Sequence, residues 1–204
     1  GTTTGLGAVV NINPTQGNST VVHTPGGKSA ELKSQFKVKF AAASLYTGSF
    51  GSLVGMNGAK IKFGRSFASR PFALHGFFQY APVAVTHIGD NQPAGTLSKG
   101  DMDVCSIYIA LAKESYTVDN TKAETFIQFK TDNNIIAYGE LPLKECVSTN
   151  GTWKEFTIDL EYKTLEKPND MYLIVVASAS KYGDYFTGGD GSILYVDDFE
   201  LIYD

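Results

Sequence analysis

The side chains best suited to chemistry gather in one glycine-rich stretch near the carboxyl end, residues 181–191. The candidate ligand-binding side chains of this stretch are Lys181, Tyr182, Asp184, Tyr185 and Asp190. Aromatic rings offer flat apolar surface, and carboxylates accept hydrogen bonds from hydroxyl groups. A sugar ring presents both an apolar C–H face and hydroxyls. The stretch is therefore a candidate glycan-binding site, and Arg70 could serve as a further polar anchor.

The same carboxylates raise the question of catalysis. Glycoside hydrolysis needs two carboxyl groups that face each other at about 5 to 9.5 Å. Asp184 and Asp190 share one predicted loop, and Asp101 and Asp103 share another. Aspartates are also ordinary turn residues, because the side chain bonds the backbone two residues on. No phosphate-binding glycine loop, GxSxG or HExxH motif occurs in the sequence, so no catalytic residue is assigned.

A second pair of carboxylates lies in the last predicted strand, residues 193–203. Alternation places Ile193, Tyr195, Phe199 and Leu201 on one inward face, which also turns Asp197 inward. A buried carboxylate is costly unless it is hydrogen-bonded, paired or bound to a cation. One interpretation is a bulge at residues 197–198, or bonds from backbone amides to the carboxylate. The other is a hard cation such as calcium, which takes oxygen ligands.

The elements around the binding stretch are strands. The apolar run that begins at Met171 and ends near Ala179 predicts a strand that is covered on both faces. Glycines permit tight turns, so residues 181–191 are predicted as an ordered, sharply folded loop. Strand, compact loop and strand together predict a terminal β-hairpin that carries rings and carboxylates at its tip.

Further strands are predicted along the rest of the chain. Residues 29–40, 70–82, 103–112 and 153–163 have the alternating or continuous apolar patterns of strands. In residues 29–40, the inward set is Ala30, Leu32, Phe36, Val38 and Phe40. Trp153 opens its strand; its ring could offer a flat surface to a sugar, but it is interpreted as a core residue. Because no helical apolar period persists, the fold class is an all-β antiparallel β-sandwich over residues 29–204. Residues 1–28 are interpreted as a linker or an edge strand.

Composition narrows the class of protein. The 204 residues are 43% hydrophobic with a net charge of −4, which suits a large β-domain and gives no basic stripe for nucleic acid. No stretch has the length of a membrane span. The chain starts without Met, so a missing leader says nothing against secretion. Cys105 and Cys146 could be separate thiols or one disulfide, and the three scattered histidines do not indicate a zinc site.

Four segments carry a resemblance to a known family. They are RPFALHGFFQYAP at 70–82, DVCSIYIALA at 103–112, IIAYGEL at 135–141 and the long segment from GTWKEF to DDFELIY at 151–203. The sequence is similar, over residues 29–204, to the putative carbohydrate metabolism domain of Bacteroidetes cell-envelope proteins. The resemblance implies a jelly-roll sandwich like that of carbohydrate-binding modules. It also implies a secreted or surface-anchored protein, often with an immunoglobulin-like domain before this one.

Two details of the resemblance concern individual residues. Ala179 stands where the family tends to have a third serine, which weakens the expectation of a hydroxyl cluster. Asp197, Asp198 and Phe199 match the two-aspartate motif near the last strand of many jelly-roll modules. The resemblance therefore implies a structural calcium with Asp197 and Asp198 as ligands.

Three functions follow as hypotheses. The first is a non-catalytic module that binds a glycan or polysaccharide on an exported or outer-membrane-anchored bacterial protein. The second is a glycoside hydrolase or lyase that uses Asp184 or Asp190 with a carboxylate elsewhere. The third is a structural module whose aromatic residues pack against a partner domain. Burial of the rings of residues 181–191 within the protein's own core would argue against the first.

Overall fold

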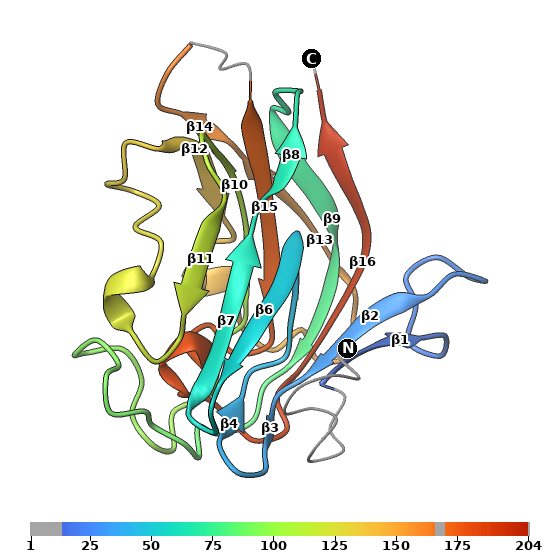
Figure 1. The fold of residues 1–204 in the computed structure, drawn as a ribbon. Coiled ribbons are helices and arrows are strands. Elements are labelled where there is room, and N and C mark those ends of the chain that lie inside the picture. Colours follow the sequence, from blue (N-terminus) through green and yellow to red (C-terminus); the bar gives the residue numbers. More distant parts are fainter. Residues whose placement is uncertain (1–13, 166–169, 204) are drawn as a thin grey trace.

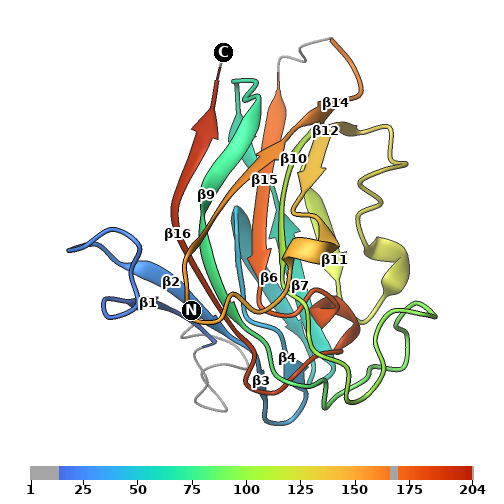
Figure 2. The same cartoon turned by 180° about the vertical axis from the view of Figure 1, so that it is seen from behind.

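The computed structural model describes residues 14–165 and 170–203, which fold into stacked antiparallel sheets (Figure 1). The five-stranded sheet has the order β1 (Thr15–Asn18), β2 (Ser29–Lys33), β16 (Ile193–Ile202), β9 (Ala73–Ala81) and β13 (Lys154–Asp159). The six-stranded sheet contains β14 (Glu161–Tyr162), β12 (Ile135–Glu140), β10 (Ser106–Ala112), β15 (Met171–Ser178), β5 (Ser44–Tyr46) and β8 (Arg65–Phe67). From behind, β14, β12, β10 and β15 follow one another across this second sheet (Figure 2).

Smaller elements complete the fold. A three-stranded sheet has the order β11 (Tyr116–Asp119), β7 (Gly58–Phe63) and β6 (Gly48–Val54), and β3 (Gln35–Phe36) pairs with β4 (Phe40–Ala41). The described residues also form three short 3₁₀ turns, η1 (Ala123–Thr125), η2 (Leu143–Glu145) and η3 (Gly183–Tyr185). No helix in the described part of the chain is long and apolar enough to cross a membrane.

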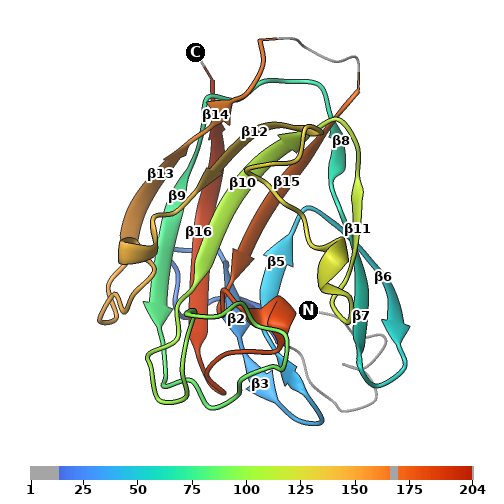
Figure 3. The same ribbon diagram turned by 90° about the vertical axis from the view of Figure 1, so that its left-hand side faces the viewer.

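The three main sheets form three layers, which Figure 3 shows edge-on. Ile107 and Ile109 on β10 point toward the five-stranded sheet and pack in the larger core with Phe78 and Leu194. Ala110, one position over on the same strand, belongs to a second core beneath the three-stranded sheet. Strands β10 and β15 are thus covered on both faces, which explains their nearly continuous apolar sequences. The prediction of an all-β antiparallel sandwich of the jelly-roll class is confirmed.

The predicted terminal hairpin is wrong. β15 lies in the six-stranded sheet, between β10 on one side and β5 and β8 on the other, so both of its edges are already paired. β16 lies in the opposite sheet and pairs with β9 and β2. Residues 179–192 therefore carry the chain across one end of the sandwich, from one layer to the other.

Two predictions of inward-facing residues also need correction. The first strand ends at Lys33 instead of continuing to residue 40, and Phe36 and Val38 are exposed. The chain leaves the sheet at Ser34, whose amide donates to the carbonyl of Ser192 and whose hydroxyl contacts that of Ser180. Trp153 is only half-buried and lies edge-on to a histidine ring on the outer face of the five-stranded sheet, not in the core.

The region around the predicted boundary at residue 28 is partly described. Residues 1–13 lie outside the described part, and β1 pairs with β2 at the edge of the five-stranded sheet. Cys105 and Cys146 are both buried free thiols in the structure. The Sγ of Cys146 lies 3.6 Å from the carbonyl oxygen of Leu141 and 3.5 Å from that of Pro142.

Candidate functional site

The crossing loop, residues 179–192, is fixed from beneath by a buried carboxylate. Oδ2 of Asp103 accepts hydrogen bonds from Ser180 Oγ (2.6 Å), the amide of Gly189 (2.8 Å) and Ser192 Oγ (2.9 Å). Its Oδ1 accepts from the amide of Val104 at 2.9 Å. Burial raises the pKa of Asp103 above its usual value, and the hydrogen bonds act against that rise. A hydroxyl cluster therefore forms here despite Ala179, and it serves the loop.

Close contacts with Tyr80, Ala42 and Phe40 fix the position of the loop's backbone. The hydroxyl of Tyr80 donates to the carbonyl of Ala179 at 2.8 Å. A Cβ on Gly183 would stand 2.0 Å from the Cβ of Ala42, and one on Gly188 would stand 2.4 Å from the ring of Phe40. Only glycine allows this approach, so these two positions explain part of the glycine content of the loop.

Phe186 has an unusual backbone conformation. Its φ of 56° lies in the left-handed region, which costs a non-glycine residue about 1 kcal/mol or more. Nζ of Lys39 lies 3.6 Å from the centroid of its ring. Strain of this kind persists where the surroundings over-determine it and is frequent at functional sites. The buried bonds to Asp103 hold the rest of the loop in place around this residue.

A cleft of about 640 Å³ opens beside the loop. Its floor is the outer face of the six-stranded sheet, where strand register puts Tyr46, Val176 and Tyr108 in one row across β5, β15 and β10. The opposite wall comes from β6 and β7, with Phe50 and Phe63 among its residues. The cleft thus has aromatic side chains on two sides, provided by two different sheets.

The rim of the cleft carries the polar groups. Asp184 is exposed, and no described residue donates a hydrogen bond to its carboxylate. The protein walls around it raise the pKa of the Asp184 carboxyl through desolvation. Lys181 is occupied instead, since its Nζ lies 3.1 Å from Oε2 of Glu140. Burial alone would raise the pKa of Glu140, but its contacts with Lys181, Tyr138 and Lys130 together lower that pKa.

The structure brings some predicted ligand-binding residues together and separates others. Lys181 and Asp184 line the 640 Å³ cleft, and Tyr185 lines an adjoining cavity. Tyr182 lines neither space. Asp190 is engaged with the protein's own backbone, because its Oδ1 accepts the amide hydrogen of Phe36 at 3.1 Å.

Arg70 lies at the other end of the sandwich. It precedes β9, whose Ala81 pairs with Ile193 beside the loop and whose Ala73 pairs with Ile202. Nine residues of strand span roughly 27 Å, so Arg70 is not a neighbour of the loop. In Figure 1, β8 lies near the carboxyl end of the chain and η3, in red, near the opposite end. Arg70 donates to the carbonyl of Thr164 at 2.8 Å and lies over the ring of Tyr162.

Sequence reasoning missed the cleft's floor. Tyr108 lies in a run of apolar residues and reads as one more core position, yet its parity is opposite to that of Ile107 and Ile109. That opposite parity within a strand covered on both faces was the available signal. Phe186 lies within residues 181–191, the stretch singled out from the sequence, but it was not among the candidate ligand-binding residues. Tyr46 gave no local signal, because β5 and the crossing loop are far apart in the sequence.

The bulge at Asp197 and Asp198, one of the two interpretations drawn from the sequence, is present. The register of β16 against β9 shifts between Asp197 and Glu200, and Asp198 has a left-handed φ of 52°. Before the bulge Leu194 and Val196 face the core, so the prediction that Ile193, Tyr195 and Asp197 point inward is wrong. After the bulge the inward parity changes to Phe199.

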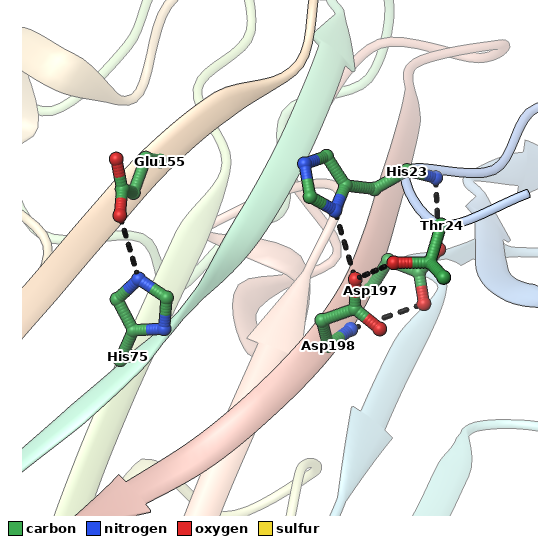
Figure 4. Close-up of polar contacts among 6 residues, drawn as sticks. All are labelled: His23, Thr24, His75, Glu155, Asp197 and Asp198. Atoms are coloured by element: carbon green, nitrogen blue, oxygen red, sulfur yellow. Dashed lines mark hydrogen bonds and ion pairs between the residues drawn. The ribbon is translucent and has the colours of Figure 1, made fainter.

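Both bulge carboxylates are held by the amino-terminal segment, as Figure 4 shows. Oδ2 of Asp197 accepts the amide hydrogen of His23 at 2.9 Å. Oδ2 of Asp198 lies 2.6 Å from Oγ1 of Thr24 and 2.8 Å from Nδ1 of His23. The His23 ring stacks on Phe77 with centroids 3.5 Å apart. A separate contact joins His75 and Glu155 on neighbouring strands.

This arrangement bears on calcium. Calcium prefers six to eight oxygen ligands, whereas these carboxylates face N–H and hydroxyl donors, so the residues as placed do not fit a calcium cage. Within residues 14–165 and 170–203, no group of three or more His, Cys, Asp or Glu side chains could hold a metal ion. Calcium binding at Asp197 and Asp198 stays a prediction. If calcium binds, it should raise Tm and EDTA should lower it; unchanged Tm with both reagents would end the idea.

Low pH should weaken the contact of Asp198 with Thr24 and His23. Hydrogen bonds from Thr24 and then His23 hold the pKa of Asp198 below its usual value. As the pH falls, the Asp198 carboxyl therefore takes up a proton in the unfolded chain before it does so in the folded protein. Its contribution to the free energy of unfolding is complete above about pH 4 and is lost as the pH falls through the folded pKa. We expect the wild type to lose more Tm between pH 5 and pH 2 than Asp198→Asn. Equal losses of Tm in the two proteins would contradict this prediction. Asp159→Asn, on an exposed strand position, is the control.

Comparison with known proteins identifies a family and similar solved structures. The family model described as "Putative carbohydrate metabolism domain" matches residues 4–202. A putative glycoside hydrolase from Bacteroides thetaiotaomicron superposes with a TM-score of 0.75 at 24% identity, over 97% of this chain and 60% of that one. A putative glycoside hydrolase from Bacteroides vulgatus gives 0.70 at 25% identity, over 93% and 77%. The chain thus spans about 60% of the length of the first of these structures. No curated protein matches the chain.

Proposed function

Because this chain belongs to the family described as "Putative carbohydrate metabolism domain", we propose that it is a non-catalytic glycan-binding module whose ligand lies in the 640 Å³ cleft. One observation carries the proposal: the cleft combines the rings of Tyr46, Tyr108 and Phe186 with the carboxylate of Asp184, to which no described residue donates a hydrogen bond. Rings can stack on the apolar face of a sugar. The carboxylate can accept from two of its hydroxyls.

The cellular setting belongs to the same proposal. We place the protein outside the cytoplasm, secreted or anchored at the outer surface of a bacterium of the Bacteroidetes, where polysaccharides are met. The Bacteroides origin of the two similar structures supports this setting. An immunoglobulin-like domain of the same protein remains a proposed neighbour. A docking role for the module is the competing proposal, and binding of a glycan in the cleft would set it aside.

A glycan array followed by titration calorimetry tests the proposal. We expect binding in the micromolar to millimolar range, about −4 to −8 kcal/mol, because a few stacking contacts in an open cleft give weak affinity. The substitution Asp184→Asn should weaken binding roughly tenfold, since an amide replaces one of the two acceptor oxygens. Asp190→Asn is the matched control in the same loop, where the carboxylate faces the protein's own backbone. Absence of any binding on the array would reject the proposal.

A hydrolase is the second candidate, and one contact favours it: Glu140 lies 3.1 Å from Lys181, which lines the cleft together with Asp184, so a second carboxylate is beside the cleft. Burial raises the pKa of Asp184, whereas the pKa of Glu140 is lowered. A carboxyl group with a raised pKa and one with a lowered pKa are the usual acid and base of a glycosidase. Against this, Glu140 lies between two ammonium groups, 3.1 Å from Lys181 and 3.3 Å from Lys130, which reduces its basicity.

Turnover separates the two candidates. A binding module should release no reducing ends from any polysaccharide that it binds. If reducing ends do appear, Asp184→Asn should abolish them and Glu140→Gln should lower the rate by at least about 100-fold. Activity that survives Asp184→Asn would remove the hydrolase candidate at this cleft.

A further inference from the structure

The cleft does not end at the loop. A second cavity of about 410 Å³ adjoins it, lined on one side by Tyr185 and Phe36. Five residues line both spaces and so mark where they meet: Lys39, Phe40, Asn120, Asp184 and Phe186. The left-handed Phe186 and the Asp184 carboxylate therefore stand between two adjacent openings, not at the closed end of one.

The second cavity offers the same kinds of groups as the first. Phe36, which is exposed, stacks on His87 with centroids 4.0 Å apart and an interplanar angle of 11°. Tyr185 contacts Phe126 edge-on and contributes a further ring. The exposed side chains of Asp90 and Asn91 supply polar groups at its edge.

Both spaces are open along their sides. Met56, at the first cavity, is 65% exposed, and Ile88, at the second, is 41% exposed. A pocket that captures the end of a chain must close around it. A groove with exposed residues along both parts instead allows a chain to enter and leave.

The charged side chains around the two cavities restrict the class of polysaccharide that can bind. The charged side chains that line the two spaces are Lys39, Lys181, Asp90 and Asp184, two of each sign. Both ammonium groups are already engaged: Lys181 with Glu140, and Lys39 with the carbonyl of Asn57 and the ring of Phe186. An acidic polysaccharide would meet two carboxylates and no unengaged cation, so electrostatics favours a neutral chain.

We propose that the ligand is an internal segment of a neutral polysaccharide, which occupies both cavities and crosses Phe186 between them. The inference rests on the proposed glycan-binding function and adds the chain length and the charge of the ligand. Phe186 presents its ring at the crossing point. Asp184 serves sugar hydroxyls on either side, because it lines both cavities.

Calorimetry with oligosaccharides of defined length tests this. The probes are neutral β-1,4-linked gluco-, galacto-, manno- and xylo-oligosaccharides of one to six units, with oligogalacturonides as the acidic counterpart. We expect affinity for the neutral series that binds to rise at least tenfold between two units and five or six. A flat dependence on length, with binding retained, would overturn the inference and leave the glycan-binding function standing. Tighter binding of oligogalacturonides would overturn the neutral class. No binding of any probe would overturn both.

Substitutions test whether the second cavity binds the sugar units that a disaccharide lacks. Phe36 and Tyr185 line only the second cavity. Phe36→Ala and Tyr185→Ala should therefore weaken the affinity for a hexasaccharide at least fivefold, while the affinity for a disaccharide changes less than twofold. Phe36 is exposed, so its substitution should leave folding intact even if that of Tyr185 does not. Tyr203→Ala, an exposed tyrosine beyond the end of β16, is the control. Equal weakening of disaccharide and hexasaccharide by Phe36→Ala would contradict the two-cavity assignment.

Discussion

Replacement of Asp103 by alanine should lower the free energy of unfolding by about 3 to 5 kcal/mol, because three donors in the buried centre of the crossing loop lose their shared acceptor. Asp103 is 1% exposed, so water cannot take its place at that point without opening the structure. Domains of this kind have only about 5 to 15 kcal/mol in total. We therefore expect the urea midpoint to fall strongly at unchanged m-value and Tm to fall by roughly 10 °C.

Asp103→Asn is the milder version of the same test. The amide keeps one acceptor oxygen but turns an NH₂ group toward donors, so we expect about half the loss seen with alanine. Asp101→Asn is the matched control, since Asp101 is exposed and its Oδ2 accepts only the amide of Ser98. It should change stability by less than about 1 kcal/mol. If Asp103→Asn were no more harmful than Asp101→Asn, the carboxylate would not be what holds the loop.

The second large effect concerns binding. Tyr108→Ala should weaken glycan affinity by about 30-fold, or 2 kcal/mol, because the ring is part of the cleft's floor beside Val176. Its neighbours Phe129 and Tyr138 hold the ring from the side, with centroids 5.0 and 6.2 Å away. Tyr108→Phe keeps this packing and should lose at most about threefold, unless the hydroxyl itself contacts the sugar.

Tyr195→Ala is the matched control for Tyr108→Ala. Tyr195 is a half-buried tyrosine in the middle of a strand, on the outer face of the opposite sheet. Its loss removes a half-buried ring of the same size but should leave affinity within twofold of wild type. Circular dichroism and Tm establish that each variant is folded before titration. If both alanine variants lowered affinity alike, the effect would come from stability and the cleft would not be the binding site.

Local sequence patterns were enough for the fold class. Period-two alternation at Phe156 and Ile158, and the continuous apolar run of β15, predict strands because side chains alternate across a pleated sheet. The same logic failed in the first half of β16, where it placed Asp197 inward with Ile193 and Tyr195 although Leu194 and Val196 face the core. The bulge at Asp197 and Asp198, one of the interpretations raised by that apparent conflict, is present. The resemblance to the family rested on such segments and holds over nearly the whole chain.

Local patterns did not decide which strands pair. Residues 171–178 and 193–202 are consecutive strands joined by a glycine-rich loop, which is also what a hairpin looks like in sequence. The outcome depended on β10, β5 and β8, which take both edges of β15, and on Asp103, which fixes the loop from 77 residues away. Such long-range pairings leave no mark on the local alternation of residues.

The sequence by itself determined a β-sandwich of a carbohydrate-related family and drew attention to the loop with Asp184 and Tyr185. Only the tertiary structure decided that Asp184 faces a cleft while Asp190 bonds the chain's own backbone, and that Arg70 lies at the far end of β9. The physical reason is that burial and alternation are properties of each strand. A cleft, in contrast, is a property of how separate sheets stack, and here the six-stranded and three-stranded sheets provide its two sides.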